Sequence, residues 1–239
     1  MRTLIYSIIA LAWLVASYFA NLNDFFLPDA IGLLAAIFTT SLIPDTLGHI
    51  GITFGRVLLG SMIAVLVGLP LGLWMAKSDP VRELLEPIFD FMRGIPVAML
   101  FPLFIVFVGF GELSRALIVV TLSLPIIIIS VMVASRPNSD NEERLAYFRL
   151  RQQLLSRKTK VRMMLWEALP GVITGLRIAL SLGLVVVIVT EMFFVASSGI
   201  GWLAYRAYEG FQIDALYFYI LIAGLISIAV NIVINRIRI

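Results

Sequence analysis

The chain has 239 residues, of which 61% are hydrophobic and 14% are charged, with one histidine, His49, and no cysteine. The absence of cysteine excludes disulfides, thiolate metal sites and cysteine nucleophiles, and a single histidine leaves little scope for histidine-based metal or acid–base chemistry. The hydrophobic fraction lies well above the soluble average of about 45–50%, which predicts that lipid is the solvent. The net charge of +3 comes from Lys and Arg beside apolar runs, so it indicates membrane topology and not nucleic-acid binding.

Apolar runs predict three spans and one interfacial helix in the first half of the chain. Residues 1–20 favour a first transmembrane helix over a signal peptide, because the apolar run is longer than a usual signal core. Residues 21–49 contain an apolar stretch too short to cross about 30 Å of hydrocarbon, which indicates an interfacial helix region on the outer face. A second span follows from about 50 to 76, and a third from about 87 to 110 with a break at 94–96.

Three further spans are expected from about 117 to 134, 171 to 195 and 215 to 234, with an outer loop at 196–214. The long polar segment 135–170 lies between the fourth and fifth spans. Its density of Lys and Arg places it in the cytoplasm by the positive-inside rule. About six spans, with the N- and C-termini cytoplasmic, put nearly every basic residue on one face of the membrane.

The remaining composition argues against an enzyme. No polar stretch is long enough to hold the core of a soluble domain. The chain also lacks a G-x-x-x-x-G-K-[ST] phosphate loop, so any energy source is a separate subunit or an ion gradient. Without paired carboxylates on one span, we expect no catalytic residue, no metal site and no cofactor on this chain.

Two ionisable residues, Arg56 and Glu191, fall inside predicted apolar spans, where an unpaired charge costs several kcal/mol. They lie at matched depth near the outer ends of the second and fifth spans, which suggests an Arg56–Glu191 ion pair. Such a pair braces the helices or lines a translocation path, and a proton relay is a third alternative. Arg177, in the fifth span, belongs to the same set of intramembrane polar residues.

Glycine and proline recur within the predicted spans. They allow close helix packing, and they are also candidate hinges for helices that pivot during a transport cycle. These candidate hinges are Gly68, Pro70, Gly72, Pro96, Pro102, Pro125, Gly171 and Gly175.

The cytoplasmic segment 135–170 is net basic and rich in helix formers. A short amphipathic helix lying across the membrane face could dock a soluble partner in a groove. The alternative is a solvated loop whose arginines fix the topology or contact anionic lipid.

Short strings from about residue 28 to the C-terminus occur in a characteristic order and spacing. They are TFGRVLLG at 53–60, GLPLGL at 68–73, FMRGIP at 91–96, FPLF at 101–104, GFGE at 109–112, ALPGVITGLR at 168–177, EM at 191–192 and SGIG at 198–201. Together they resemble the permeases of ABC importers of the nitrate, sulfonate and taurine type.

The resemblance implies an all-α permease of the type I ABC importer architecture in a prokaryotic inner membrane, with residues 50–239 as the permease core. It implies a second permease copy or paralogue, an outer-face solute-binding protein, and two cytoplasmic ABC ATPase subunits that carry ATP and Mg. The solute would be a sulfonate, nitrate, taurine or a vitamin precursor. ATP hydrolysis would then belong to the partner subunits.

In that family a Glu-Ala-Ala motif, with a glycine a few residues later, forms the coupling helix that sits in the ATPase groove. This chain departs from the pattern, since Gln153 stands near the glycine position. We expect coupling through the 142–162 loop, by a helix of different sequence or by heterodimerisation with a more typical permease. A non-transporting scaffold or receptor with a degenerate coupling loop is the rival function. The candidate coupling residues are Gln153, Leu154, Leu155, Ser156, Arg157 and Lys158.

Overall fold

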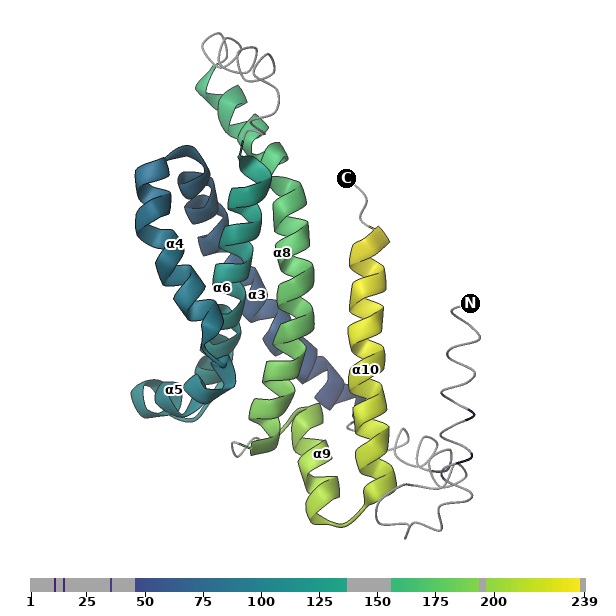
Figure 1. Ribbon diagram of the computed structural model, residues 1–239. Coiled ribbons are helices and arrows are strands. Elements are labelled where there is room, and N and C mark those ends of the chain that lie inside the picture. The colour runs from purple at the N-terminus through teal and green to yellow at the C-terminus, as the bar shows by residue number, and fades with distance from the viewer. Residues whose placement is uncertain are drawn as a thin grey trace. The chain divides into compact units, whose positions relative to one another are not determined.

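The computed structural model describes residues 46–136, 156–193 and 197–236, together with Leu11, Val15 and Ala35. These residues form helices joined by short turns, and the described part of the chain contains no strand. The elements shown in Figure 1 are α3 (Thr46–Lys77), α4 (Asp79–Gly94), the 3-10 helix η1 (Val97–Leu100), α5 (Phe101–Val108), α6 (Glu112–Ser135), α8 (Arg157–Phe193), α9 (Ile200–Glu209) and α10 (Ile213–Arg236).

Four of these helices are long and apolar enough to cross a membrane. They contain the candidate spans Thr46–Lys77, Glu112–Ser135, Val161–Phe193 and Ile213–Ile234. The second, fourth, fifth and sixth spans predicted from the sequence are therefore confirmed as helices α3, α6, α8 and α10. The predicted helix at 1–20 and nearly all of the predicted interfacial region 21–49 lie outside the described residues.

The third predicted span is not one helix. The chain is already helical from Asp79, earlier than the expected start near 87, and α4 then meets the η1 and α5 segment at a bend of 90°. The break falls at the predicted place, because Pro96 lacks an N–H and pushes the preceding residue out of the helical region. Ile95 is indeed extended, with φ −83° and ψ 130°. The bent pair gives up to a fifth span if it crosses as one.

Two segments predicted to connect spans contain helical residues. The predicted outer loop at 196–214, between the fifth and sixth spans, contains the ten-residue helix α9, Ile200–Glu209. Helix α9 forms because its small and apolar residues recur on one face, which buries Ile200, Ala204 and Ala207. Helix α8 begins at Arg157, well before the expected 171.

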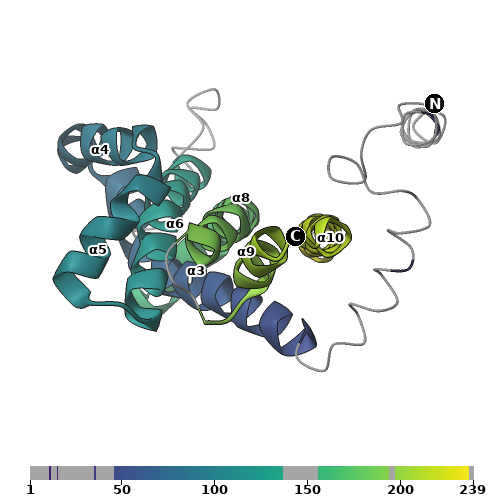
Figure 2. The same ribbon diagram turned by 90° about the horizontal axis from the view of Figure 1, so that it is seen from below.

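The chain forms two compact units, described here separately. The first unit comprises Met1–Phe54 and Ile188–Ile228, and the second comprises Gly55–Val187 and Ala229–Ile239. In the first unit, α9 packs against α10 (Figure 2), where Ile200, Ala204 and Ala207 contact Phe218 and Tyr219.

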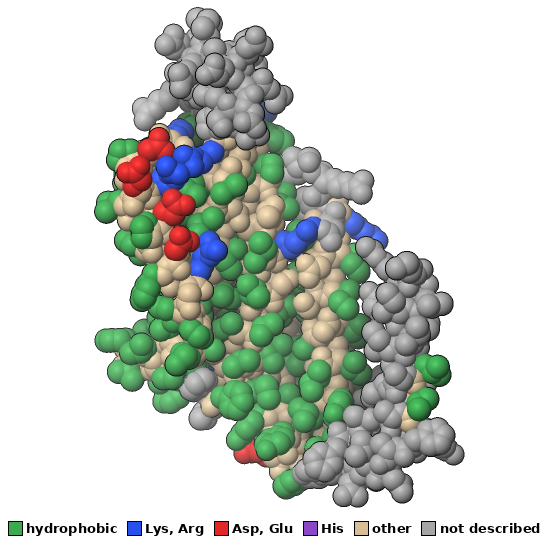
Figure 3. Space-filling model, viewed as in Figure 1, with side chains coloured by type: hydrophobic (Ala, Val, Ile, Leu, Met, Phe, Trp, Pro, Cys, Tyr) green, Lys and Arg blue, Asp and Glu red, His purple; other side chains and the backbone are tan. Residues whose placement is uncertain are grey.

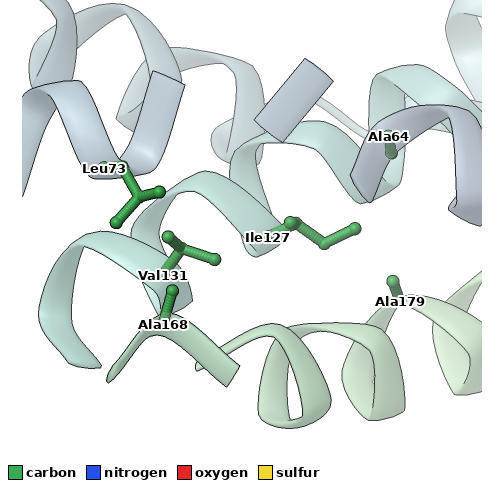
Figure 4. Close-up of a cluster of buried hydrophobic side chains, with 6 residues drawn as sticks. All are labelled: Ala64, Leu73, Ile127, Val131, Ala168 and Ala179. Carbon is green, nitrogen blue, oxygen red and sulfur yellow. The ribbon is translucent and has the colours of Figure 1, made fainter. Parts of the chain in front are cut away.

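The second unit is built around α6. In the cluster drawn in Figure 4, Ala64 and Leu73 of α3 and Ala168 and Ala179 of α8 pack against Ile127 and Val131 of α6. A second cluster joins α4 to this core through Met75, Phe89, Ile128 and Met132. Acidic residues of α4 such as Asp79 and Glu83 are exposed, and Figure 3 shows red and blue side chains gathered on the surface at this helix.

Glycine lets α3 and α8 approach α6 closely. A Cβ added at Gly72 would lie 2.7 Å from the Ile128 carbonyl oxygen, and one added at Gly171 would lie 2.5 Å from that of Ser130. Contacts this short leave no room for a side chain, so these glycines act in helix packing.

Gly72→Ala is expected to destabilise the bundle by about 1–3 kcal/mol, because the new methyl group must displace the α6 backbone. Gly55→Ala on the same helix is the matched control, since a Cβ there meets no described atom within 4 Å. The thermal midpoint of each purified variant in detergent, followed by size-exclusion chromatography, measures the difference. Equal midpoints for the two variants would contradict the packing assignment.

Candidate functional site

A buried carboxylate organises the first unit. Glu191 stands near the end of α8 and is 1% exposed. Its two carboxylate oxygens accept hydrogen bonds from the Thr53 hydroxyl, at 3.0 and 2.9 Å. The backbone N–H of Gly201 donates a further hydrogen bond to Oε2 at 3.0 Å. Glu191 thus joins α3 and α8 to the first turn of α9.

The start of α9 is shaped around this carboxylate. The Thr53 hydroxyl also accepts a hydrogen bond from the Ile200 N–H at 2.9 Å. Gly199 has φ 113°, and a Cβ there would lie 2.2 Å from the carboxyl carbon of Glu191. Only glycine tolerates this backbone conformation at so short a distance.

His49 adds a third contact to the same helix start. Its Nδ1 accepts a hydrogen bond from the Gly199 N–H at 2.8 Å, and its ring lies 5.2 Å from that of Trp202. Arg206 lies over the Trp202 ring at 5.0 Å, a cation–π contact. Side chains of α3 and α8 thus accept the hydrogen bonds of the first free N–H groups of α9.

This arrangement is a helix cap made by remote residues. The first N–H groups of a helix lack internal partners and carry a partial positive charge, so a carboxylate is favourable there. Glu191, Thr53 and His49 satisfy three successive N–H groups, those of Gly199, Ile200 and Gly201. We name these six residues, with the hydrogen bonds that join them, the α9 cap.

The second unit holds an ion cluster at the start of α6. Arg56, which is 6% exposed, donates from Nε and Nη2 to the two carboxylate oxygens of Glu112, at 2.7 and 2.5 Å. Arg115 donates to Glu112 Oε1 at 2.9 Å. The Glu112 side chain is 65% exposed. A carboxylate in the first turn of α6 also suits the positive end of that helix.

The three polar residues predicted to lie within spans are all in helices, and the hydrogen-bond partners of two of them are described. Arg56 binds Glu112, and Glu191 belongs to the α9 cap. The direct ion pair between Arg56 and Glu191 stays a prediction. Arg177 lies within α8, one turn before Ser181, whose hydroxyl accepts a hydrogen bond from Asn231 at 3.1 Å.

A cavity of about 510 Å³ lies in the second unit, at the break between α4 and η1. The end of α4, the 95–97 segment, α6 and α8 form its wall. Two predicted hinges, Pro96 and Pro125, line it. We name it the break cavity.

The other candidate hinges lie in three settings. Gly68, Pro70 and Gly72 are inside the continuous helix α3, and Gly171 and Gly175 face α6 at short range. Pro102 opens α5, where a proline is favoured because its missing N–H is not needed. Their role as hinges stays a prediction.

Half of the candidate coupling residues are described. Ser156 is exposed and precedes α8, and its hydroxyl oxygen lies 2.9 Å from the Thr159 hydroxyl oxygen and accepts the Thr159 N–H at 3.4 Å. Arg157 begins the helix, and Lys158 is exposed. Gln153, Leu154 and Leu155 lie outside the described residues.

Comparison with known proteins assigns the family. The sequence model of one protein family, described as the binding-protein-dependent transport system inner membrane component, matches residues 68–238 of this chain. This match covers most of the chain, which therefore belongs to that family.

Individual relatives agree with the resemblance read from the short strings. The taurine transport system permease protein TauC of Escherichia coli K12 is 29% identical over 187 residues, which cover 76% of this chain. The chain spans 63% of the length of that relative. An E. coli K12 permease protein assigned to aliphatic sulfonate transport, SsuC, is 30% identical over 220 residues, covering 92% of this chain and 82% of the relative.

A solved structure shares the fold. The MetNI methionine ABC transporter in inward-facing conformations matches with a TM-score of 0.65 and 20% identity, over 77% of this chain and 90% of that one. The helical fold is therefore that of a multi-pass ABC permease.

Thr53→Val is expected to destabilise the protein by about 1–3 kcal/mol, because it leaves the Ile200 N–H and one side of the Glu191 carboxylate without the hydroxyl. In a Glu191→Gln background the same substitution should cost less, since the carboxylate is already gone. The thermal midpoints of the wild type, the two single variants and the double variant form a double-mutant cycle that measures this coupling. Strictly additive effects would contradict a shared cap.

Proposed function

We propose that this chain is the membrane-spanning permease subunit of an ATP-driven importer for small sulfonates. The family match over residues 68–238 is the observation that carries this proposal. The relatives named for taurine and aliphatic sulfonate transport support the solute class. A separate solute-binding protein would deliver the solute to the outer face.

The proposed topology has about six spans with cytoplasmic termini in a prokaryotic inner membrane. The basic residues near the start of α8 support a cytoplasmic location for that end, by the positive-inside rule. The α9 cap then lies toward the outer face, where it fixes the first turn of α9.

The proposed mechanism is alternating access driven by partner subunits. Two ATPases, which hold ATP and Mg, would close on ATP binding and move the segment near Ser156 to Lys158. A second permease copy or a paralogue would complete the path. The break cavity supports this mechanism, because a helix broken beside a cavity provides both a route and a flexible point.

A non-transporting scaffold or receptor is the rival function. It has the same helices, and it differs by having no working connection to ATP. The departure of the coupling segment around Gln153 from the family pattern favours it. Transport measurements separate the two.

Proteoliposomes that contain this permease, its copurified ATPases and the solute-binding protein are expected to accumulate labelled taurine when ATP is supplied. A non-hydrolysable ATP analogue should abolish accumulation, because the cycle then stops after closure. Accumulation that is independent of ATP would contradict the importer, and no accumulation of taurine or ethanesulfonate would favour the scaffold.

Leu154→Asp combined with Leu155→Asp should weaken ATPase association roughly tenfold or more, because carboxylates replace apolar contacts in the docking groove. Asn138→Asp is the control, since it adds a negative charge in the same loop outside the 142–162 segment. Copurification of the ATPase with the tagged permease measures the effect. Intact association in the double variant would remove these leucines from the coupling contact.

A further inference from the structure

The break cavity combines an apolar wall with very few polar side chains. Arg93 and Ser130 are the polar ones among the residues that line it. Aliphatic residues, proline and methionine form the rest, including Ile126 of α6 and Leu182 of α8. Its volume of about 510 Å³ falls in the range of small-ligand sites, and a few polar groups in an apolar pocket are typical of them.

The backbone at the cavity supports a binding role independently of the side chains. Helix α4 ends at Gly94, and the chain turns by 90° before η1. Non-helical backbone at membrane depth is tolerated where protein buries it or where it lines a hydrated cavity. Several transporter folds place their solute at such interrupted helices.

Arg93 has unused hydrogen-bonding capacity. Its side chain is 50% exposed, and its ion pair within the described residues is with Asp90, at 3.4 Å between Nη1 and Oδ1. This long contact occupies one of five guanidinium N–H donors. The planar guanidinium matches an oxyanion with two parallel hydrogen bonds. A bound anion would also offset a positive charge beside an apolar wall.

We propose that the break cavity binds a small alkanesulfonate, with the sulfonate on Arg93 and the alkyl chain against the aliphatic residues of α6 and α8. Ser130 supplies a hydroxyl donor from the α6 wall. The choice of a sulfonate rests on the proposed import function, whereas the cavity itself specifies an anionic head and a short apolar tail.

Arg82 offers a matched control on the same helix. It pairs with Asp79, three residues earlier, at 3.3 Å, just as Arg93 pairs with Asp90. Arg82 does not line the cavity. Replacement of either arginine removes one i,i+3 ion pair and one positive charge, and only one replacement alters the proposed site.

The full-length chain, purified in detergent with its accompanying subunits, is titrated with butane-1-sulfonate by isothermal titration calorimetry. Wild type and Arg82→Gln should bind equally. Arg93→Gln should bind roughly tenfold to a hundredfold more weakly, the usual effect of losing a charge-assisted hydrogen bond. Arg93→Lys should fall between them, because it keeps the charge without the planar fork. The affinity of the wild type for the neutral butyl methyl sulfone should be no higher than the affinity of Arg93→Gln for butane-1-sulfonate.

Asp90→Asn separates a binding site from a structural ion pair. In a binding site the aspartate competes for Arg93, so its neutralisation should strengthen sulfonate binding by roughly twofold to fivefold, the range of an exposed pair. In a structural pair, Asp90→Asn and Arg93→Gln should both weaken binding. Size-exclusion profiles establish that each variant is folded.

The proposal is overturned if Arg93→Gln binds like wild type, if Arg82→Gln loses as much affinity as Arg93→Gln, or if Asp90→Asn weakens binding. Transport tests the other proposal separately. If sulfonate binding depends on Arg93 but no ATP-driven uptake occurs, the proposed binding site stands and the proposed importer function fails. If Arg93→Gln binds and transports sulfonate as the wild type does, the proposed importer function stands and the proposed binding site fails.

Discussion

Hydrocarbon offers no hydrogen-bonding partner, so each polar group that enters the membrane must be satisfied by the protein itself. Continuous helices meet this requirement for the backbone, which accounts for the lengths of α3, α6, α8 and α10. The same requirement governs the buried side chains. Glu191 accepts a hydrogen bond from the Gly201 N–H, which has no partner inside α9, so this contact serves both groups. Arg56 is satisfied by both oxygens of one carboxylate.

Hydrocarbon imposes a second constraint on helix packing, because apolar side chains gain little by leaving lipid tails for one another. Dispersion contacts between near backbones must then hold the bundle together. Helix α6 receives Gly72 from α3 and Gly171 from α8 at distances that exclude a Cβ. At the α4–η1 break the chain bends by 90°, and the cavity lies beside this bend.

Features that depend on local patterns could be predicted from the sequence. Apolar runs located four of the long helices, and Pro96 located the break. Contacts between distant residues could not be predicted, because Thr53 and Glu191 are 138 positions apart and nothing local links them. The glycines at 199 and 201 are visible in the SGIG string, but the need for glycine at 199 is not. It comes from the Glu191 carboxyl group, which would lie 2.2 Å from a Cβ at that position.

Helix α8 has 37 residues and a length of about 55 Å, well beyond the roughly 30 Å of the hydrocarbon core. Under the proposed coupling, a push at Lys158 reaches Ile178 and Leu182 in the cavity wall without crossing a loop. Pro170 lies inside this helix and removes one backbone hydrogen bond from it. The next residue, Gly171, lies so close to α6 that it leaves no room for a side chain. Under that coupling, the movement that reaches the cavity would depend on the contact between α8 and α6 beside Pro170.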